Sequence, residues 1–149
     1  MKLGIAGYGY VGQAMEELFK DYHEIIISDP NKNHYGDLRH ADAVIICVST
    51  PGTNNGYCDV TNVGDVIEEC PDANILIKST ISIEGWLQIN ADFPNHYICF
   101  SPEFLRAETA LEDFKNQDVM YISLEKSGSH EHWEQVFKGC LNNLSLIHI

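Results

Sequence analysis

Basic residues are scarce in this 149-residue sequence: nine lysines and arginines stand against 22 aspartates and glutamates, and the formal net charge is −13. Phosphate-rich surfaces repel such a protein, which argues against nonspecific binding to nucleic acid or to an anionic membrane. We therefore expect neither as a partner. Any phosphate-bearing ligand is expected to be held locally by backbone N–H groups.

Long apolar runs, paired cysteines and a signal-peptide pattern are also lacking. No run is long enough to cross a membrane and the chain starts with a strand, so we expect a cytoplasmic protein. The five cysteines are an odd number without a CxxC pair, which favours neither a disulfide framework nor a metal site. The composition, 44% hydrophobic and 21% charged, is typical of one globular domain.

The amino-terminal stretch from Lys2 to Asp29 reads as strand, glycine turn, helix and second strand. Its glycines, Gly7, Gly9 and Gly12, have the GxGxxG spacing of a dinucleotide site. The first allows a tight turn, the second lets the backbone approach a pyrophosphate, and the third lets the helix lie close to the sheet. Three ordinary turn glycines are the alternative interpretation.

Asp29 ends the second apolar strand, at the distance from Gly9 where a carboxylate accepts hydrogen bonds from the adenosine ribose. A carboxylate there repels a ribose 2′-phosphate and so favours NAD over NADP. Lys32, His34 or Arg39 could soften that repulsion. The alternative for Asp29 is an ordinary turn residue at a strand end.

Strand-like and helix-like segments alternate along the chain. The expected strands are the apolar runs 2–6, 24–28, 43–48, 74–78, 97–100 and 119–124. The expected helices follow Gly9 and occupy about 61–70, 83–89, part of 101–116, and 129–141. Strands that are apolar along most of their length are typical of a parallel sheet covered on both faces. The sequence therefore predicts an α/β, doubly wound Rossmann domain with about six strands.

In such a sheet the ligand lies across the carboxyl ends of the strands. We therefore expect the segments that follow the strands to converge on one site: 7–12, Asp29, 48–52, 79–80 and 101–106.

Four of these segments together resemble one family. They are GYGYVG at 7–12, VSTP at 48–51, KST at 78–80 and SPEFLR at 101–106. In order and spacing they are similar to the amino-terminal NAD domain of the UDP-glucose/GDP-mannose dehydrogenases, which oxidise a primary alcohol of a nucleotide sugar to a carboxylate with two NAD. The resemblance covers residues 1 to about 141, and we expect the NAD domain to span 1–143.

The resemblance implies roles for individual residues. The cofactor-binding residues would be Gly7, Tyr8, Gly9, Tyr10, Val11, Gly12, Asp29, Val48, Ser49, Thr50, Pro51, Ser79 and Thr80. The residues that contact the sugar nucleotide, with UDP-glucose the favoured substrate, would be Glu103, Phe104, Leu105, Arg106 and Ala107. The resemblance also implies a homodimer for the full-length protein.

Two of these residues would be catalytic. Thr80 would help to orient the water that hydrolyses a thioester intermediate, and Glu103 would be the family's catalytic glutamate, with a pKa raised by its apolar neighbours. The alternatives are a hydroxyl that caps the next helix for Thr80 and a surface carboxylate that caps a helix for Glu103.

The sequence departs from the family at three places. Ser49 stands where a proline is usual, the segment after Thr80 reaches a glycine later than usual, and Ala107 occupies the place of a second glutamate. Either Glu108 substitutes by a small shift or one carboxylate is missing.

The family's nucleophilic cysteine, and the lysine and asparagine before it, belong to a connecting helix and a carboxy-terminal domain that this sequence does not contain. We therefore expect the chain to bind NAD without completing the reaction alone. Residues 144–149 (LSLIHI) resemble a translated transposon end used in sequencing libraries, so we expect a non-native tail and a natural protein that continues past Asn143. The alternative functions are a stand-alone NAD-binding or regulatory module and a dehydrogenase of the 3-hydroxyacid type.

Overall fold

The computed structural model describes residues 1–117, 119–123, 129–140 and 145–148. Its elements, in chain order, are β1 (Lys2–Ala6), α1 (Tyr10–Phe19), β2 (Glu24–Asp29), the 3-10 helix η1 (Pro30–Lys32), β3 (His34–Tyr35), the 3-10 helix η2 (Leu38–His40), β4 (Ala43–Ile46), α2 (Thr61–Glu69), β5 (Asn74–Ile77), α3 (Ile83–Asp92), β6 (Ile98–Phe100), α4 (Ala110–Lys115), β7 (Val119–Ile122), α5 (Ser129–Phe137) and β8 (Ser145–His148).

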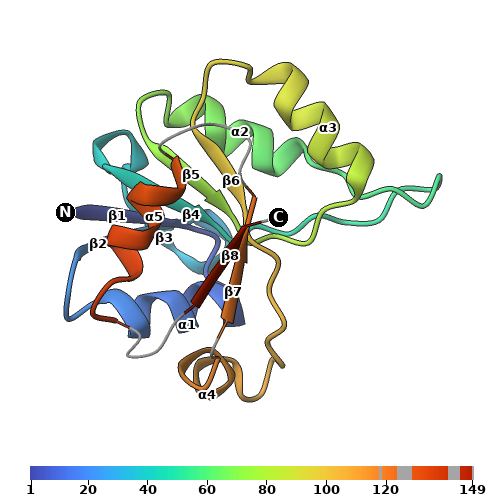
Figure 1. Ribbon diagram of the computed structural model, residues 1–149. Coiled ribbons are helices and arrows are strands. Elements are labelled where there is room, and N and C mark those ends of the chain that lie inside the picture. Colours follow the sequence, from blue (N-terminus) through green and yellow to red (C-terminus); the bar gives the residue numbers. More distant parts are fainter. Residues whose placement is uncertain (118, 124–128, 141–144, 149) are drawn as a thin grey trace.

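The central sheet has six strands in the order β3-β2-β1-β4-β5-β6 (Figure 1). All pairs are parallel except β2 with β3, which is antiparallel at the edge. The chain winds outward from β1 in both directions, because β2 flanks it on one side and β4 on the other. This confirms the predicted Rossmann architecture and places the topological switch point, where ligands bind in such sheets, between the carboxyl ends of β1 and β4.

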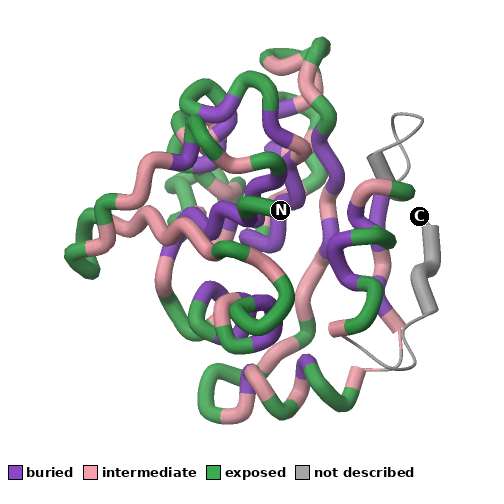
Figure 2. Tube along the Cα trace, turned by 90° about the vertical axis from the view of Figure 1, so that its left-hand side faces the viewer, coloured by how far each residue is buried: buried purple, intermediate pink, exposed green. Residues whose placement is uncertain are grey.

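Helices cover both faces of the sheet, as expected. Alternate strand residues point to opposite faces, so Leu3, Ile5 and Ile45 pack in a core with α1, α4 and α5. Val44 and Ile46 of β4 pack in a second core with α2 and α3. Figure 2 shows the resulting pattern, with buried segments in the interior and exposed ones around them. Both faces are apolar because neither faces water.

The sixth strand of the sheet differs from the expected one. It is β3, a two-residue edge strand that carries no apolar run and was not predicted. The expected strand from Val119 instead pairs with β8 in a separate two-stranded parallel sheet. The amide of Ser123 still reaches the main sheet, because it donates to the carbonyl of Phe100 at 2.9 Å. Leu124 lies outside the described residues.

Helices α1, α2, α3 and α5 begin at the predicted positions, and α4 lies within 101–116, but some helix ends differ from the expected ones. Helix α3 extends to Asp92, past the predicted end at Ile89, and α5 ends at Phe137. Leu141, the predicted end of that last helix, lies outside the described residues. So do Leu144 and Ile149 of the expected tail, while 145–148 form β8. The expected boundary at Asn143 stays a prediction.

Within the described ranges, no helix is long and apolar enough to span a membrane. Helices α1 and α3 have ten residues each, about half the length that a crossing requires. The same residues contain no cluster of three histidine, cysteine, aspartate or glutamate side chains that could hold a metal ion.

Candidate functional site

The three glycines of the turn after β1 differ in how closely other atoms surround them. Gly7 has a φ of +88°, and a Cβ there would lie 2.6 Å from the carbonyl oxygen of Cys47. A Cβ on Gly12 would lie 2.1 Å from the carbonyl oxygen of Gly7. A Cβ on Gly9 would meet no atom within 4 Å. Two of the glycines are therefore needed for the fold, whereas the third leaves open space toward a cleft.

Helix α1 presents an uncapped amino terminus to that cleft. Its N-cap is Gly9, which has no side chain to accept a hydrogen bond, and the first turn carries no acidic residue. The free N–H groups of the first turn and the positive end of the helix dipole form an anion-binding position. It lies at the switch point of the sheet, where the predicted phosphate site was placed.

Asp29 is held firmly at the end of β2. Its Oδ2 accepts a hydrogen bond from the backbone N–H of Tyr8 at 2.7 Å, and its Oδ1 accepts one from the N–H of Asn31 at 3.1 Å. Each carboxylate oxygen keeps a further lone pair for a ligand hydroxyl. Asp29 lines the cleft, as predicted, and it ties the glycine turn to β2 at the same time.

The three basic residues that could offset Asp29 have different positions. Lys32 lines the cleft beside it. Arg39 instead pairs with Asp37 on the surface, with 2.7 Å between Nη2 and Oδ2. The ring of His34 packs edge-on against the ring of Tyr8, with 4.4 Å between centroids. Lys32 is thus the one candidate of the three that reaches the cleft.

The cleft has a volume of about 660 Å³ and runs along the carboxyl ends of β1, β2, β4 and β5. The predicted cofactor or catalytic residues that line it are Gly7, Tyr8, Gly9, Tyr10, Val11, Asp29, Val48, Ser49, Thr50, Ser79, Thr80 and Glu103. Of the predicted cofactor residues, Gly12 is packed beneath the turn and Pro51 lies outside the lining. Residues of α2 complete one wall: Asn62, Asp65, Val66 and Glu69. Sequence reasoning did not include these four, because a helix interior carries no strand-end pattern.

Hydrogen bonds join the strand-end loops around the cleft. The Thr50 hydroxyl donates to the Thr80 carbonyl, and the Ser79 hydroxyl donates to the Val48 carbonyl at 2.7 Å. Thr80 does not cap α3, because the N-cap is Ser82, whose Oγ accepts from the N–H of Gly85 at 3.2 Å. The alternative role for Thr80 as a helix cap is therefore wrong. Its exposed side chain lines the cleft.

Glu103 lies at the end of the cleft near the glycine turn. The Tyr10 hydroxyl donates to its Oε1 at 3.4 Å, while its Oε2 is buried without a hydrogen-bond partner. Burial raises the pKa of Glu103, and the positive charge of Lys78 opposes that change. The expected raised pKa is thus found. Glu103 does not cap a helix either, since the N-cap of α4 is Thr109.

Lys78 is a further cleft residue that sequence reasoning did not include among the site residues. Only 3% of it is exposed, and it lines the floor of the cleft. Its Nζ donates to Oγ of Ser101 at 3.2 Å and to the Ser101 carbonyl at 3.3 Å. Burial lowers its pKa to about 8. A signal was present in the sequence, because a lysine directly after the apolar run NILI is placed at a buried strand end.

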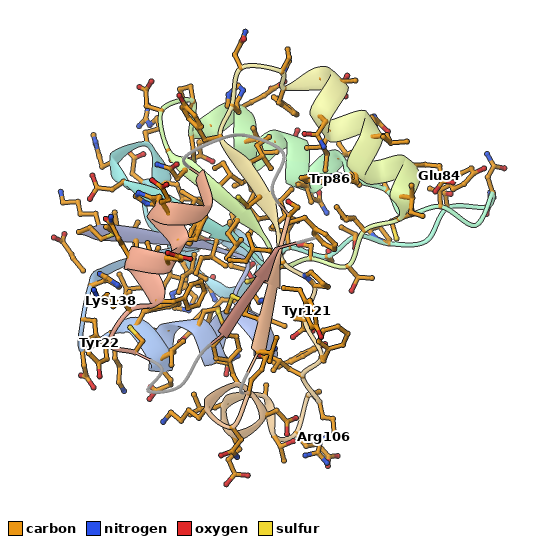
Figure 3. The ribbon with its side chains drawn as sticks, viewed as in Figure 1. Tyr22, Glu84, Trp86, Arg106, Tyr121 and Lys138 are labelled. Carbon is orange, nitrogen blue, oxygen red and sulfur yellow. The ribbon has the colours of Figure 1, made fainter. Side chains whose placement is uncertain are left out.

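The residues after Glu103 turn away from the cleft. Phe104 is 68% exposed and contacts the ring of Tyr121. Leu105 lines a second hollow of about 330 Å³ beside α4 and β7. Arg106 points outward at the edge of the molecule (Figure 3), and its Nη2 lies 2.7 Å from Oδ1 of Asp113. Ala107 and Glu108 are exposed in the turn before α4, so Glu108 does not line the cleft.

Comparisons with known proteins agree with this geometry. Residues 31–141 match the NAD-binding domain of the UDP-glucose/GDP-mannose dehydrogenase family. The chain is 30% identical over 110 residues to a UDP-glucose 6-dehydrogenase of Rickettsia felis, an alignment that covers 68% of this chain and 25% of that protein. It is 28% identical over 152 residues to a UDP-glucose 6-dehydrogenase of Streptococcus pneumoniae, with 76% of this chain and 38% of that protein covered.

Solved structures show the same fold. A GDP-mannose dehydrogenase from Pseudomonas aeruginosa superposes with a TM-score of 0.77 at 19% identity, over 99% of this chain and 46% of the other. A UDP-glucose dehydrogenase from Pyrobaculum islandicum gives 0.77 at 18% identity over the same shares. The chain thus spans between a quarter and two fifths of the two curated relatives described above.

Proposed function

The chain belongs to the UDP-glucose/GDP-mannose dehydrogenase family as its NAD-binding domain, and on this premise we propose that it is the NAD-binding half of a nucleotide-sugar 6-dehydrogenase. NAD is its cofactor by family. The proposed reaction is oxidation of a primary alcohol to a carboxylate, with UDP-glucose as the first substrate to test. The observation that carries the proposal is that Thr80 and Glu103 share one cleft with the glycine turn.

The cleft suits a dinucleotide along its whole length. Gly9 and the first-turn amides of α1 would hold the pyrophosphate, because no Cβ and no side-chain cap intervene there. The adenosine ribose lies beside Asp29, whose oxygens retain acceptor capacity. The nicotinamide would then lie toward Thr80 and Glu103. The bound cofactor supplies the hydride acceptor for each of the two oxidations.

Glu103 is suited to proton exchange. Its carboxyl group is half-buried, one oxygen has no partner, and its pKa is raised by burial. A group whose pKa lies closer to neutrality gives up and accepts protons more readily at physiological pH. We assign to it the exchange of a proton near the reacting carbon, directly or through a water. Thr80 lines the same cleft, and we assign to its hydroxyl the orientation of that water.

This part of the enzyme is proposed to bind NAD without completing the reaction. The second oxidation in the family needs a thiolate. Cys47 is the cysteine in the cleft lining, and burial raises its pKa to about 12, so its thiol stays protonated. Burial also raises the pKa values of Cys70 and Cys140 to about 11. None of these three thiols is activated as a nucleophile at neutral pH.

The test is binding of the nucleotide sugar to the NAD-loaded chain. Saturation-transfer NMR with UDP-glucose, and separately with GDP-mannose, should give signals for the sugar C6 protons that weaken at least threefold in Glu103→Gln. The matched control is Glu108→Gln, which removes an exposed carboxylate outside the cleft and should change nothing. Equal signals from both variants would refute the assignment of Glu103, and the absence of signal for every nucleotide sugar would favour a stand-alone NAD-binding module.

A further inference from the structure

A buried ammonium group lies beneath the cleft. Lys78 directly follows β5, and its side chain is almost fully enclosed. Burying a charged amine costs several kcal/mol unless hydrogen bonds and an opposite charge compensate for it, and an apolar side chain of the same length would avoid the cost. Lys78 is nevertheless buried at this position. Its contacts indicate a structural role for its charge and its hydrogen bonds.

Lys78 connects two strand ends. Its Nζ donates to the carbonyl and to Oγ of Ser101, and its backbone N–H donates to the carbonyl of Ile46 at 2.9 Å. The backbone N–H of Ser101 in turn donates to the carbonyl of Ile77 at 2.9 Å. Ser101 is therefore held by both the backbone of β5 and the side chain that follows it. Glu103 stands only two residues further along the same segment.

The ionisable groups around Lys78 are Cys47 and Glu103. The Cys47 thiol is neutral at physiological pH because burial raises its pKa to about 12. From α4, the ring of Phe114 lies 5.6 Å from Nζ and contributes a cation–π contact but no charge. Glu103, which lines the same cleft, is thus the acidic group whose charge acts on the ammonium. The ammonium in turn opposes the rise in the pKa of Glu103 that burial causes, and Oε2 of Glu103 has no hydrogen-bond partner.

We propose that Lys78 is a positioning residue of the dehydrogenase: through Ser101 it anchors the segment that carries Glu103, and its charge holds the Glu103 side chain as a carboxylate beside the cleft. This inference rests on the proposed function for its purpose. Its physical content, a coupling between two side chains, is measurable without any turnover.

The coupling can be measured in the unmodified chain. The pKa of Lys78 is lowered to about 8, so the ammonium is mostly charged at pH 7 and neutral above pH 9. The carboxyl ¹³C resonance of Glu103, assigned by its loss in Glu103→Gln, should therefore show its main titration step and a second, smaller step near pH 8. A resonance that stays flat between pH 7 and pH 9 overturns the proposal.

Two substitutions separate charge from anchoring. Lys78→Gln keeps a hydrogen-bond donor without the charge, and Lys78→Met keeps neither. Both should move the main titration step of Glu103 upward by about one pH unit, because an opposite charge is lost. Only Lys78→Met should accelerate amide exchange at Ser101, by about tenfold. Lys115→Gln, at an exposed lysine of α4, is the control and should change neither measurement.

The outcomes distinguish this inference from the proposed function. An unchanged Glu103 titration in folded Lys78→Gln overturns the role of Lys78, whatever sugar nucleotide the chain binds. If the variants do not fold, the second step near pH 8 in the unmodified chain decides alone. A normal coupling together with no binding of any nucleotide sugar would instead refute the proposed function and leave the coupling in place.

Discussion

Alanine substitutions at Gly9 and Gly12, only three residues apart, should affect different properties. Gly12→Ala should lower stability, whereas Gly9→Ala should lower NAD affinity. In Gly12→Ala the new Cβ would lie 2.1 Å from the carbonyl oxygen of Gly7, more than 1 Å closer than ordinary contact. Gly7 is restrained on both sides, because its N–H donates to the carbonyl of Ser28 at 2.8 Å and a Cβ on it would already lie 2.6 Å from the carbonyl oxygen of Cys47. Helix α1 must move instead.

That movement has a calculable cost. Helix α1 is fixed by fully buried side chains, among them Met15 and Phe19, so lifting it loosens one core of the domain. Overpacking of this kind typically costs about 1–3 kcal/mol, and we expect the upper end because the obstacle is backbone. For a domain of this size, about 3 kcal/mol corresponds to a fall of roughly 6–12 °C in Tm.

Gly9→Ala should leave the fold nearly intact. Its φ of −76° and ψ of −165° suit any residue, and the new Cβ meets nothing within 4 Å. Alanine is a poorer N-cap than glycine, which costs about 0.5–1 kcal/mol. The methyl group would project into the space assigned to the pyrophosphate, so NAD affinity should fall at least tenfold, or about 1.4 kcal/mol.

Thermal unfolding followed by circular dichroism and calorimetric titration with NAD⁺ check both variants. An unchanged Tm in Gly12→Ala would show that α1 does not lie as close to the turn as the structure places it. Unchanged NAD affinity in Gly9→Ala would show that the cofactor does not cross this glycine. The three glycines would then be turn glycines only.

Three further outcomes are expected. Asp29→Asn should reduce the preference for NAD over NADP about tenfold in competitive titration, since a charge-assisted hydrogen bond to ribose is weakened; an unchanged ratio would remove that role. Ile45→Ala, fully buried in β4, should lower the free energy of unfolding by about 2–5 kcal/mol in urea, whereas Leu87→Ala, 62% exposed, should change it by less than about 0.5 kcal/mol. Folding lowers the pKa of Lys78 from its usual 10.5 to about 8. Between pH 8 and pH 10.5 the lysine is therefore mostly neutral in the folded chain but protonated in the unfolded chain, so the free energy of unfolding rises with pH across that range. Relative to Lys78→Met, the wild type should therefore gain about 3 kcal/mol of stability between pH 8 and pH 10.5, and parallel pH profiles would contradict this.

The strand ends illustrate how far sequence reasoning reached into the site. Parallel strands bring their carboxyl ends to one edge, so the convergence of Asp29, Thr80 and Glu103 with the glycine turn followed from the order of apolar runs alone. The residues after Glu103 were expected to contact the sugar nucleotide, which stays a prediction. In the structure Arg106 bonds to Asp113 and Phe104 packs on Tyr121, so these two side chains lie outside the cleft.

By itself, the sequence determined the Rossmann sheet, the glycine turn and the strand ends that form the cleft, because these depend on local patterns: unbroken apolar runs, glycine spacing and chain order. Only the tertiary structure decided which strand completes the sheet. That strand, β3, is only two residues long and has no apolar run, and it forms by pairing with the free edge of β2. It also decided the place of Lys78. Its amine is buried, with a lowered pKa, only because Ser101 and Phe114 contact it from segments more than twenty residues away in the sequence.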